Sequence, residues 1–181
     1  MTQAAIEKLK YPAGIYKKPE HINAADLTGY IKTIEQFPKK IKKETNNLTK
    51  DALNYLHRPE GWTIRQLVHH CADSHLNAFI RIKLTLTENK PTVKPYLENE
   101  WAKLPDTAEA PIEWSLMILE GVHNRWANLM HSMKTEDFQK TYIHPEYKRE
   151  FKIEEVVCLY AWHCIHHLAH IKQAQHYKNN F

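Results

Sequence analysis

Four long segments with helical spacing constrain the fold of this 181-residue chain more than any other feature. They cover about residues 24–47, 63–87, 111–133 and 153–177, and in each one apolar side chains recur at every third or fourth position. The chain has only four glycines, whereas turn-rich β proteins use many. No segment shows a convincing strand pattern, so we expect an all-α protein built as a four-helix bundle.

The ends of these segments carry recognisable helix signals. Thr63 is a suitable N-cap for the second segment, and Pro111 suits the first turn of the third. Glu154 and Glu155 would favour the start of the last helix through its dipole. Pro38 lies inside the first segment, where we expect a kink or an interruption.

The remaining parts of the chain are expected to lack long helices. Residues 1–22 contain two prolines and a glycine, and we predict an extended N-terminal arm there. Residues 89–110 and 134–151 form loops that are longer than a simple bundle needs, and loops of this length often cover binding sites. We expect both loops to fold over one end of the bundle and form a pocket. No linker or repeat divides the chain, which predicts a single domain over residues 1–181.

The composition argues against nucleic-acid and membrane partners. The formal net charge is +4 and the charged residues are interleaved, so the chain lacks a basic patch for nucleic acid. No apolar run reaches the ~18 residues of a membrane span, and the N-terminus does not have the apolar core of a signal peptide. The three cysteines, Cys71, Cys158 and Cys164, do not form a disulfide pattern, and reduced thiols predict a cytoplasmic protein.

The last helical segment contains a cluster of histidines in the stretch WHCIHHLAH, Trp162–His170. At about 100° per residue, His163, His167 and His170 fall within roughly 60° of one another on a face directed toward the bundle interior. His166 points away from the centre of that face. Because His163 and His167 are four residues apart, their rings lie one above the other and would be able to share a metal ion.

The second helical segment offers a partner for this pair. His70 shares a polar face with Asp73, Ser74, Asn77 and Arg81, and that face is either solvated or lines an interior cavity. The histidines of the last segment favour the cavity. We therefore predict a site of His70, His163 and His167 for one divalent metal ion, with Asp73 among the residues that would orient a ligand ring.

Three imidazoles with open coordination positions are typical of a catalytic metal site. Zinc and nickel both suit imidazole, and the sequence does not choose between them. The alternative is that these histidines are hydrogen-bonded core residues without a metal. Four other histidines are interpreted as ordinary polar residues of the core or the surface, namely His69, His75, His123 and His131.

Several other residues are candidates for contact with a small-molecule substrate. Trp62, Tyr96, Trp101 and Trp162 would wall an apolar pocket, although large aromatic side chains more often fill cores. Arg81 would meet a substrate carboxylate or else remain solvated. His144 would approach the site from its loop, but the Pro145 that follows it also marks an ordinary turn.

The segments YPAGIYKKPEHI, WTIRQLVHHCADSHLNAFIRIKLTLTE, YIHPEY and LYAWHCIHHLAHI give the chain a family resemblance. Over nearly its whole length it resembles the DinB/YfiT-like superfamily, and specifically the YfiT branch of metal-dependent hydrolases. The resemblance implies a four-helix bundle that binds one divalent ion, zinc or nickel, through His70, His163 and His167. It also implies a homodimer. One departure from the family pattern, Cys71 in place of a leucine-like residue, is expected to be harmless.

Two metal-dependent chemistries fit such a site. The metal would activate a water for hydrolysis, or it would deprotonate a low-molecular-weight thiol for transfer to an electrophile. The family resemblance supports both, because members are called hydrolases and related bundles act as thiol-S-transferases, including bacillithiol-dependent ones. The sequence places no obvious carboxylate as a general base, Asp73 being the nearest, and this favours thiol transfer. The alternative is a non-catalytic metal-binding or stress- and damage-response accessory protein.

Overall fold

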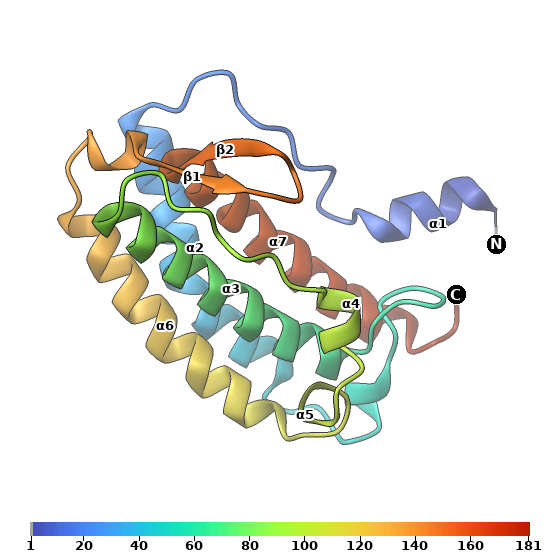
Figure 1. The fold of residues 1–181 in the computed structure, drawn as a ribbon. Coiled ribbons are helices and arrows are strands. Elements are labelled where there is room, and N and C mark those ends of the chain that lie inside the picture. Colours follow the sequence, from blue (N-terminus) through green and yellow to red (C-terminus); the bar gives the residue numbers. More distant parts are fainter. Residues whose placement is uncertain (1) are drawn as a thin grey trace.

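The computed structural model describes residues 2–181 and confirms the expected four-helix bundle (Figure 1). The bundle is formed by the four long helices α2 (Ala24–Thr45), α3 (Ile64–Thr87), α6 (Ile112–Ser132) and α7 (Ile153–Tyr177). Their buried faces enclose a core of aliphatic and aromatic side chains, in which Phe37, Leu67 and Trp126 are among the fully buried members.

The four helices are not packed in simple chain order. Helix α2 packs against α6 and α7, and helix α3 packs against the same two neighbours. Consecutive helices α2 and α3 therefore lie on a diagonal of the bundle. This arrangement places α3 beside α7 (Figure 1). These are the two helices that carry His70, His163 and His167.

The start of α3 follows the sequence prediction closely. The Thr63 side chain accepts a hydrogen bond from the backbone N–H of Gln66, and Gln66 Oε1 accepts one from the Thr63 N–H. This reciprocal capping box satisfies two N–H groups that the first turn leaves free. Pro111 is the N-cap of α6, one position before the first turn. Pro38 does not interrupt α2, because the helix continues to Thr45 with Pro38 itself buried against the core.

The N-terminal arm was predicted to be extended throughout, and this is wrong for its first part. Residues Gln3–Lys10 form a helix, α1, and the Thr2 side chain caps it by accepting from the Ala5 N–H. This segment contains alanine, leucine, lysine and glutamate, which all favour helix. The proline and glycine residues act only further along, so residues 11–23 are free of regular structure.

The prediction that the chain contains no strand is also wrong. Strands β1 (Thr141–His144) and β2 (Arg149–Lys152) form an antiparallel hairpin, in which Tyr142 pairs with Phe151. Tyr142 and His144 alternate inward along β1, and Pro145 begins the turn. Four-residue strands give too short an alternation to stand out from a loop.

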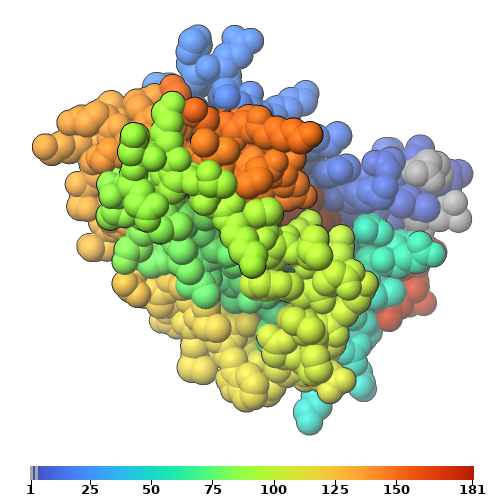
Figure 2. Space-filling model, in the orientation of Figure 1, coloured from blue at the N-terminus to red at the C-terminus, as the bar shows by residue number. Residues whose placement is uncertain are grey.

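The loop before α6 also contains regular structure. It includes two single-turn helices, α4 (Glu98–Trp101) and α5 (Pro105–Ala108), and two 3-10 turns lie elsewhere, at Ala52–Asn54 and Asp137–Gln139. The loop is tied to the hairpin, because Ile143 N–H donates to the Pro91 carbonyl at 2.9 Å and Val93 N–H donates to the Ile143 carbonyl at 3.0 Å. Figure 2 shows the two segments, in yellow-green and orange, side by side on one face of the molecule.

Across residues 2–181, no helix combines the length and the apolar character that crossing a bilayer would require.

Candidate metal centre

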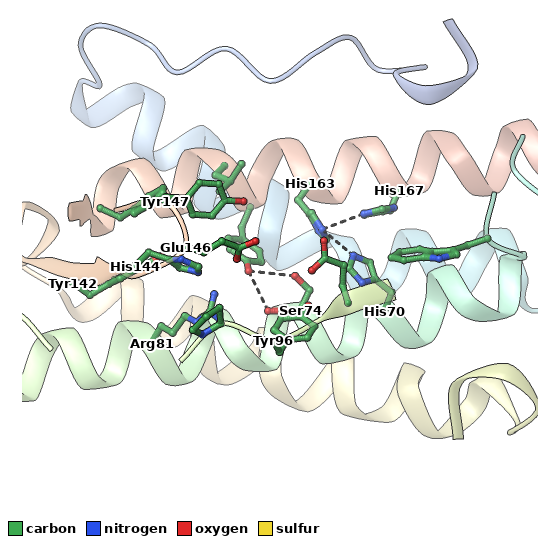
Figure 3. Close-up of a pocket in the computed structure, with 16 residues that line it drawn as sticks. His70, Ser74, Arg81, Tyr96, Tyr142, His144, Glu146, Tyr147, His163 and His167 are labelled. Carbon is green, nitrogen blue, oxygen red and sulfur yellow. Dashed lines mark hydrogen bonds between the residues drawn. The ribbon is translucent and has the colours of Figure 1, made fainter. Parts of the chain in front are cut away.

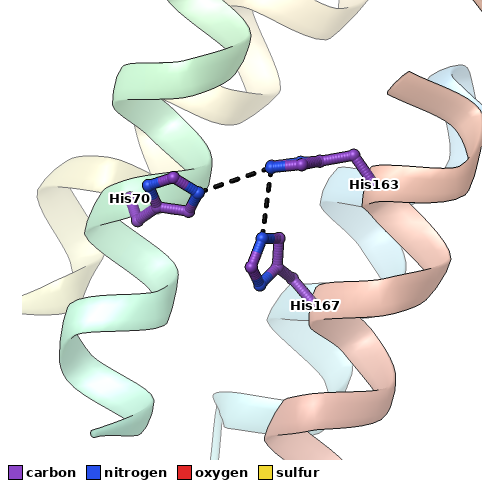
Figure 4. A group of neighbouring side chains, drawn as sticks. All are labelled: His70, His163 and His167. Carbon is purple, nitrogen blue, oxygen red and sulfur yellow. Dashed lines mark hydrogen bonds between the residues drawn. The ribbon is translucent and has the colours of Figure 1, made fainter. Parts of the chain in front are cut away.

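The structure brings together the three histidines that the sequence selected as metal ligands. His70 projects from the second turn of α3, and His163 and His167 project from the middle of α7 (Figure 4). His163 Nε2 lies 3.4 Å from His70 Nε2 and 3.1 Å from His167 Nε2. All three Nε2 atoms therefore face one point between the two helices.

The spacing of these nitrogens suits a bound metal ion. Nitrogens held 2.0–2.1 Å from a tetrahedral ion lie about 3.3–3.4 Å apart, close to the two distances of 3.1 and 3.4 Å. Burial lowers the pKa of His70 to about 4 and the pKa of His163 and His167 well below 6.5. The rings are therefore neutral near pH 7, and neutral imidazole is the form that binds metals.

A second line of histidines lies behind His163. His163 Nδ1 is 2.9 Å from His75 Nε2, and His75 Nδ1 is 2.7 Å from His123 Nε2. His123 Nδ1 contacts the Ile34 carbonyl oxygen at 2.6 Å, and both His75 and His123 are completely buried. Sequence reasoning missed this arrangement, because the partners of His75 lie on other helices and periodicity within α3 does not reveal them.

A second group of imidazoles lies next to the first along α7. His166, His167 and His170 each offer a nitrogen within 4.8 Å of the others. His170 Nε2 already contacts the Lys10 carbonyl at 3.1 Å, and His170 Nδ1 lies 3.5 Å from His167 Nδ1. His166 stacks on Trp162, with ring centroids 4.3 Å apart. Because His167 and His170 are already committed to these contacts, we assign no separate metal site here.

A cavity of about 380 Å³ opens beside the three metal-ligand candidates (Figure 3). Its walls come from α3, α7, the hairpin and the loop around Tyr96. The α3 residues that line it run from His70 to Arg81, which corresponds to about 16 Å along a helix. The two loops therefore cover the side of the bundle between α3 and α7, and not its end as the sequence suggested.

The cavity includes some of the predicted substrate residues but not others. Trp62, Tyr96 and Arg81 line it, and the Trp62 ring packs against His70 at a centroid distance of 4.7 Å. Trp101 does not line the cavity, and its ring packs at a tilt against Tyr96 with the ring centroids 4.5 Å apart. Trp162 is also outside, since its indole N–H donates to the Gly14 carbonyl.

Asp73 does not line the cavity either, so the structure gives no support to its role as a catalytic base. It is partly buried, and burial together with the nearby Asp106 carboxylate raises the pKa of Asp73 to about 6. Although it belongs to the polar face that the sequence identified, Asp73 is turned away from the cavity toward the segment before α6.

Two carboxylates that sequence reasoning missed do line the cavity, Glu98 and Glu146. Glu146 lies in the hairpin turn and extends between His144 and His163 (Figure 3). Glu98, at the start of α4, also lines a second cavity of about 310 Å³, which shares Trp62 and His167 with the first. No sequence signal marks these two residues, because their positions depend on how the loops fold over the helices.

The end of the cavity away from the metal-ligand candidates carries the positive charge of Arg81, with the Glu146 carboxylate nearby. Arg81 reaches it from α3, and its Nη2 donates to the Lys94 carbonyl at 2.8 Å. His144 lies opposite on β1, and its Nδ1 is buried without a hydrogen-bond partner among the described residues. Burial and the Arg81 charge lower the pKa of His144. An anionic group would accept hydrogen bonds from Arg81 and from the neutral His144 ring when its proton is on Nδ1.

Comparison with known proteins identifies the family. The DinB superfamily domain matches residues 33–171, and the chain belongs to that superfamily. It is 38% identical to a solved structure described as "YfiT from Bacillus subtilis is a probable metal-dependent hydrolase with an unusual four-helix bundle topology". The two superpose with a TM-score of 0.91 over 95% of this chain and 98% of the other.

Curated relatives agree with this placement. A Bacillus cereus (strain 03BB102) protein named "Putative metal-dependent hydrolase" is 46% identical over 165 residues, which are 90% of this chain and 93% of the relative. A protein of Bacillus thuringiensis subsp. konkukian with the same description matches with the same identity and coverage. The similarity to YfiT and to these relatives thus extends over nearly the whole length of the chain.

Proposed function

We propose that this protein is a metal-dependent hydrolase that binds one divalent ion, zinc or nickel, through His70, His163 and His167. The observation that carries the proposal is the meeting of three neutral Nε2 atoms in the wall of a cavity. The names of the relatives provide independent support, since both they and the Bacillus subtilis protein are described as metal-dependent hydrolases.

The residues around the site suggest how hydrolysis would proceed. When bound, a divalent ion held by three imidazoles polarises a substrate oxygen and lowers the pKa of a coordinated water toward about 7. The three histidines occupy one side of the site and leave the side toward the cavity open. Glu98 and His167 both line the two cavities, and we assign the Glu98 carboxylate as the acceptor of a proton from the attacking group. Glu146 is the alternative acceptor.

The shape of the cavity indicates the kind of substrate. Tyr142, Tyr147 and Tyr160 provide largely apolar walls, and Arg81 offers a positive charge at the far end. We propose a small molecule with an anionic group that binds Arg81 while its reacting bond lies near His163. Arg81 follows His70 by roughly 16 Å along α3, which gives the scale of that separation.

Transfer of a low-molecular-weight thiol is the second candidate. The sequence favoured it because no carboxylate was available as a base, and Glu98 and Glu146 remove that reason. The observation that still supports thiol transfer is the second cavity. It shares Trp62, Glu98 and His167 with the first cavity and offers separate room for a second reactant.

The test is a turnover assay of the metal-loaded protein against a panel of esters and amides, and against a thiol with an electrophile. We expect metal-dependent turnover of the first panel that is lost in His163→Ala. The exposed His131 is the control, and His131→Ala should retain full activity. Turnover of the thiol panel alone would favour transfer, whereas stoichiometric metal binding without turnover in either panel would favour the accessory role.

Two further proposals concern the setting of the protein. The three buried, unpaired cysteines suit a reducing compartment, and we propose a cytoplasmic location.

A second copy of the chain is the proposed partner, because Trp114, Met117 and Ile118 form an exposed apolar stripe on α6. Light scattering should give twice the 21.4 kDa of one chain, and Trp114→Glu should reduce it to the monomer mass.

A further inference from the structure

Three histidines form a continuous hydrogen-bonded line from the candidate metal centre to a backbone carbonyl. The line passes from His163 to His75, then to His123, and ends at the Ile34 carbonyl oxygen, with distances of 2.9, 2.7 and 2.6 Å. These four residues come from α7, α3, α6 and α2 respectively. One line of hydrogen bonds thus joins all four helices of the bundle, with the proposed metal ligand His163 at one end and the Ile34 carbonyl at the other.

The chemistry at the far end gives this line a direction. The Ile34 carbonyl oxygen only accepts, so His123 Nδ1 must carry a proton and donate it. A neutral imidazole has one N–H, which leaves His123 Nε2 as an acceptor for a proton on His75 Nδ1. His75 Nε2 is then an acceptor in turn, and His163 Nδ1 must donate to it. Complete burial of His75 and His123 favours these neutral forms.

The result at His163 is a fixed tautomer. With its proton on Nδ1, the ring directs the Nε2 lone pair toward His70 and His167. A ring held by hydrogen bonding at one nitrogen is also fixed in orientation and becomes a more basic ligand at the other.

A looser counterpart stands behind His167. His170 Nε2 donates to the Lys10 carbonyl at 3.1 Å, and its Nδ1 faces His167 Nδ1 at 3.5 Å. The same reasoning places a proton on His167 Nδ1, but the longer contact fixes it less firmly.

We propose that His75 and His123 are positioning residues. Through their hydrogen bonds to one another and to the Ile34 carbonyl, they keep the proton of His163 on Nδ1 and hold its Nε2 lone pair toward the metal. The proposal rests on the proposed function, since it assigns His163 as a ligand. It adds two residues to the site that neither contact the cavity nor belong to the three ligands.

The first test reads the tautomers directly in metal-free protein. Long-range ¹H–¹⁵N correlation spectra of the full chain with ¹⁵N-labelled histidine distinguish the protonated from the free ring nitrogen. His163, His75 and His123 are each expected to carry the proton on Nδ1. A proton on Nε2 of His163 would overturn the proposal, whatever the protein binds. Because no metal is present, this result is independent of the proposed function, which a failure of wild-type protein to bind Zn²⁺ would overturn instead.

The second test compares two amide variants of His75. His75→Gln places an amide oxygen close to the position of Nε2 and keeps an acceptor for His163, whereas His75→Asn reaches only the position of Nδ1. We expect His75→Asn to weaken Zn²⁺ binding by about 10–100-fold, the usual cost of losing such a partner, and His75→Gln to recover most of that loss.

The control is His69→Gln on the same helix. His69 is also buried and bonded, to Ser115 Oγ at 2.7 Å and to the Ala110 carbonyl at 3.2 Å, so neither of its ring nitrogens is bonded to any of the three ligands. Its variant should bind Zn²⁺ like wild type. Equal Zn²⁺ affinities for His75→Asn and His75→Gln would overturn the proposal, and the spectra of wild-type protein decide the question if either variant does not fold.

Discussion

The two walls of the cavity are built in different ways. One wall is made by α3 and α7, which carry the three imidazoles and are fixed by the packing of the bundle. The opposite wall is made by the loop around Tyr96 and the hairpin, which carry Glu98 and Glu146 and are joined through Pro91 and Ile143. Under the proposed function, the helices supply the three metal ligands and the anion-binding Arg81, whereas the loops supply the two carboxylates and part of the cavity wall.

The largest effect is expected when the helical wall is broken. His163→Ala removes the nitrogen closest to both other ligands, and two imidazoles alone would not retain the ion through purification. We expect loss of bound metal and of all metal-dependent turnover, measured by elemental analysis and by rate. A His163→Ala protein with a full complement of metal would contradict the assignment.

The next largest effect is expected on the loop wall. Glu98→Gln keeps the size of the side chain but removes the proton acceptor, and general-base catalysis contributes about 10²–10⁴-fold in rate. The turnover rate should fall by that order while the metal content stays at the wild-type level. Glu146→Gln is the matched comparison, and a larger fall in Glu146→Gln than in Glu98→Gln would exchange the two roles.

The buried histidines predict a stability that depends on pH in the metal-free protein. Burial lowers the pKa of His57, His123 and His166 to about 4, against 6.5 when unfolded. Between these values the unfolded chain binds more protons, so stability is complete above pH 6.5 and is lost as the pH falls toward 4. Each group adds up to about 1.4 kcal/mol per pH unit. Urea unfolding at pH 7.5 and pH 5 measures the loss, and equal free energies of unfolding would refute it.

The smallest effect is expected at the far end of the cavity. Arg81→Met should raise the KM for anionic substrates about tenfold, the value of one charge-assisted contact, and leave neutral analogues of the same size unaffected. Steady-state kinetics with a matched pair of substrates measures the difference. An equal change for both substrates would show that Arg81 acts only through its bond to the Lys94 carbonyl.

The same contrast between helices and loops explains what the sequence could predict. The positions of His70, His163 and His167 follow from helical periodicity, because residues on one face of a helix keep that face in any bundle. The capping of α3 by Thr63 is equally local and was correct. These features depend on a few neighbouring residues, so one sequence is enough to find them.

The features that were missed depend on contacts between distant segments. Glu98 and Glu146 reach the cavity from two loops that pair through Ile143. Asp73 lies about 60° from His70 around α3, which is far enough to keep it out of the cavity wall. In the sequence, His75 resembles any polar residue of the core, because its partners His123 and His163 lie on two other helices. Periodicity does not report which helices become neighbours.

X-ray absorption spectroscopy of protein purified without added metal is the sharpest test of whether one divalent ion binds to three imidazoles. We expect about one zinc or nickel ion per chain, with three imidazole nitrogens at about 2.0–2.1 Å, and loss of one of them in His167→Gln. Protein that contains no ion, or an ion whose coordination shell is unchanged in His167→Gln, would contradict it.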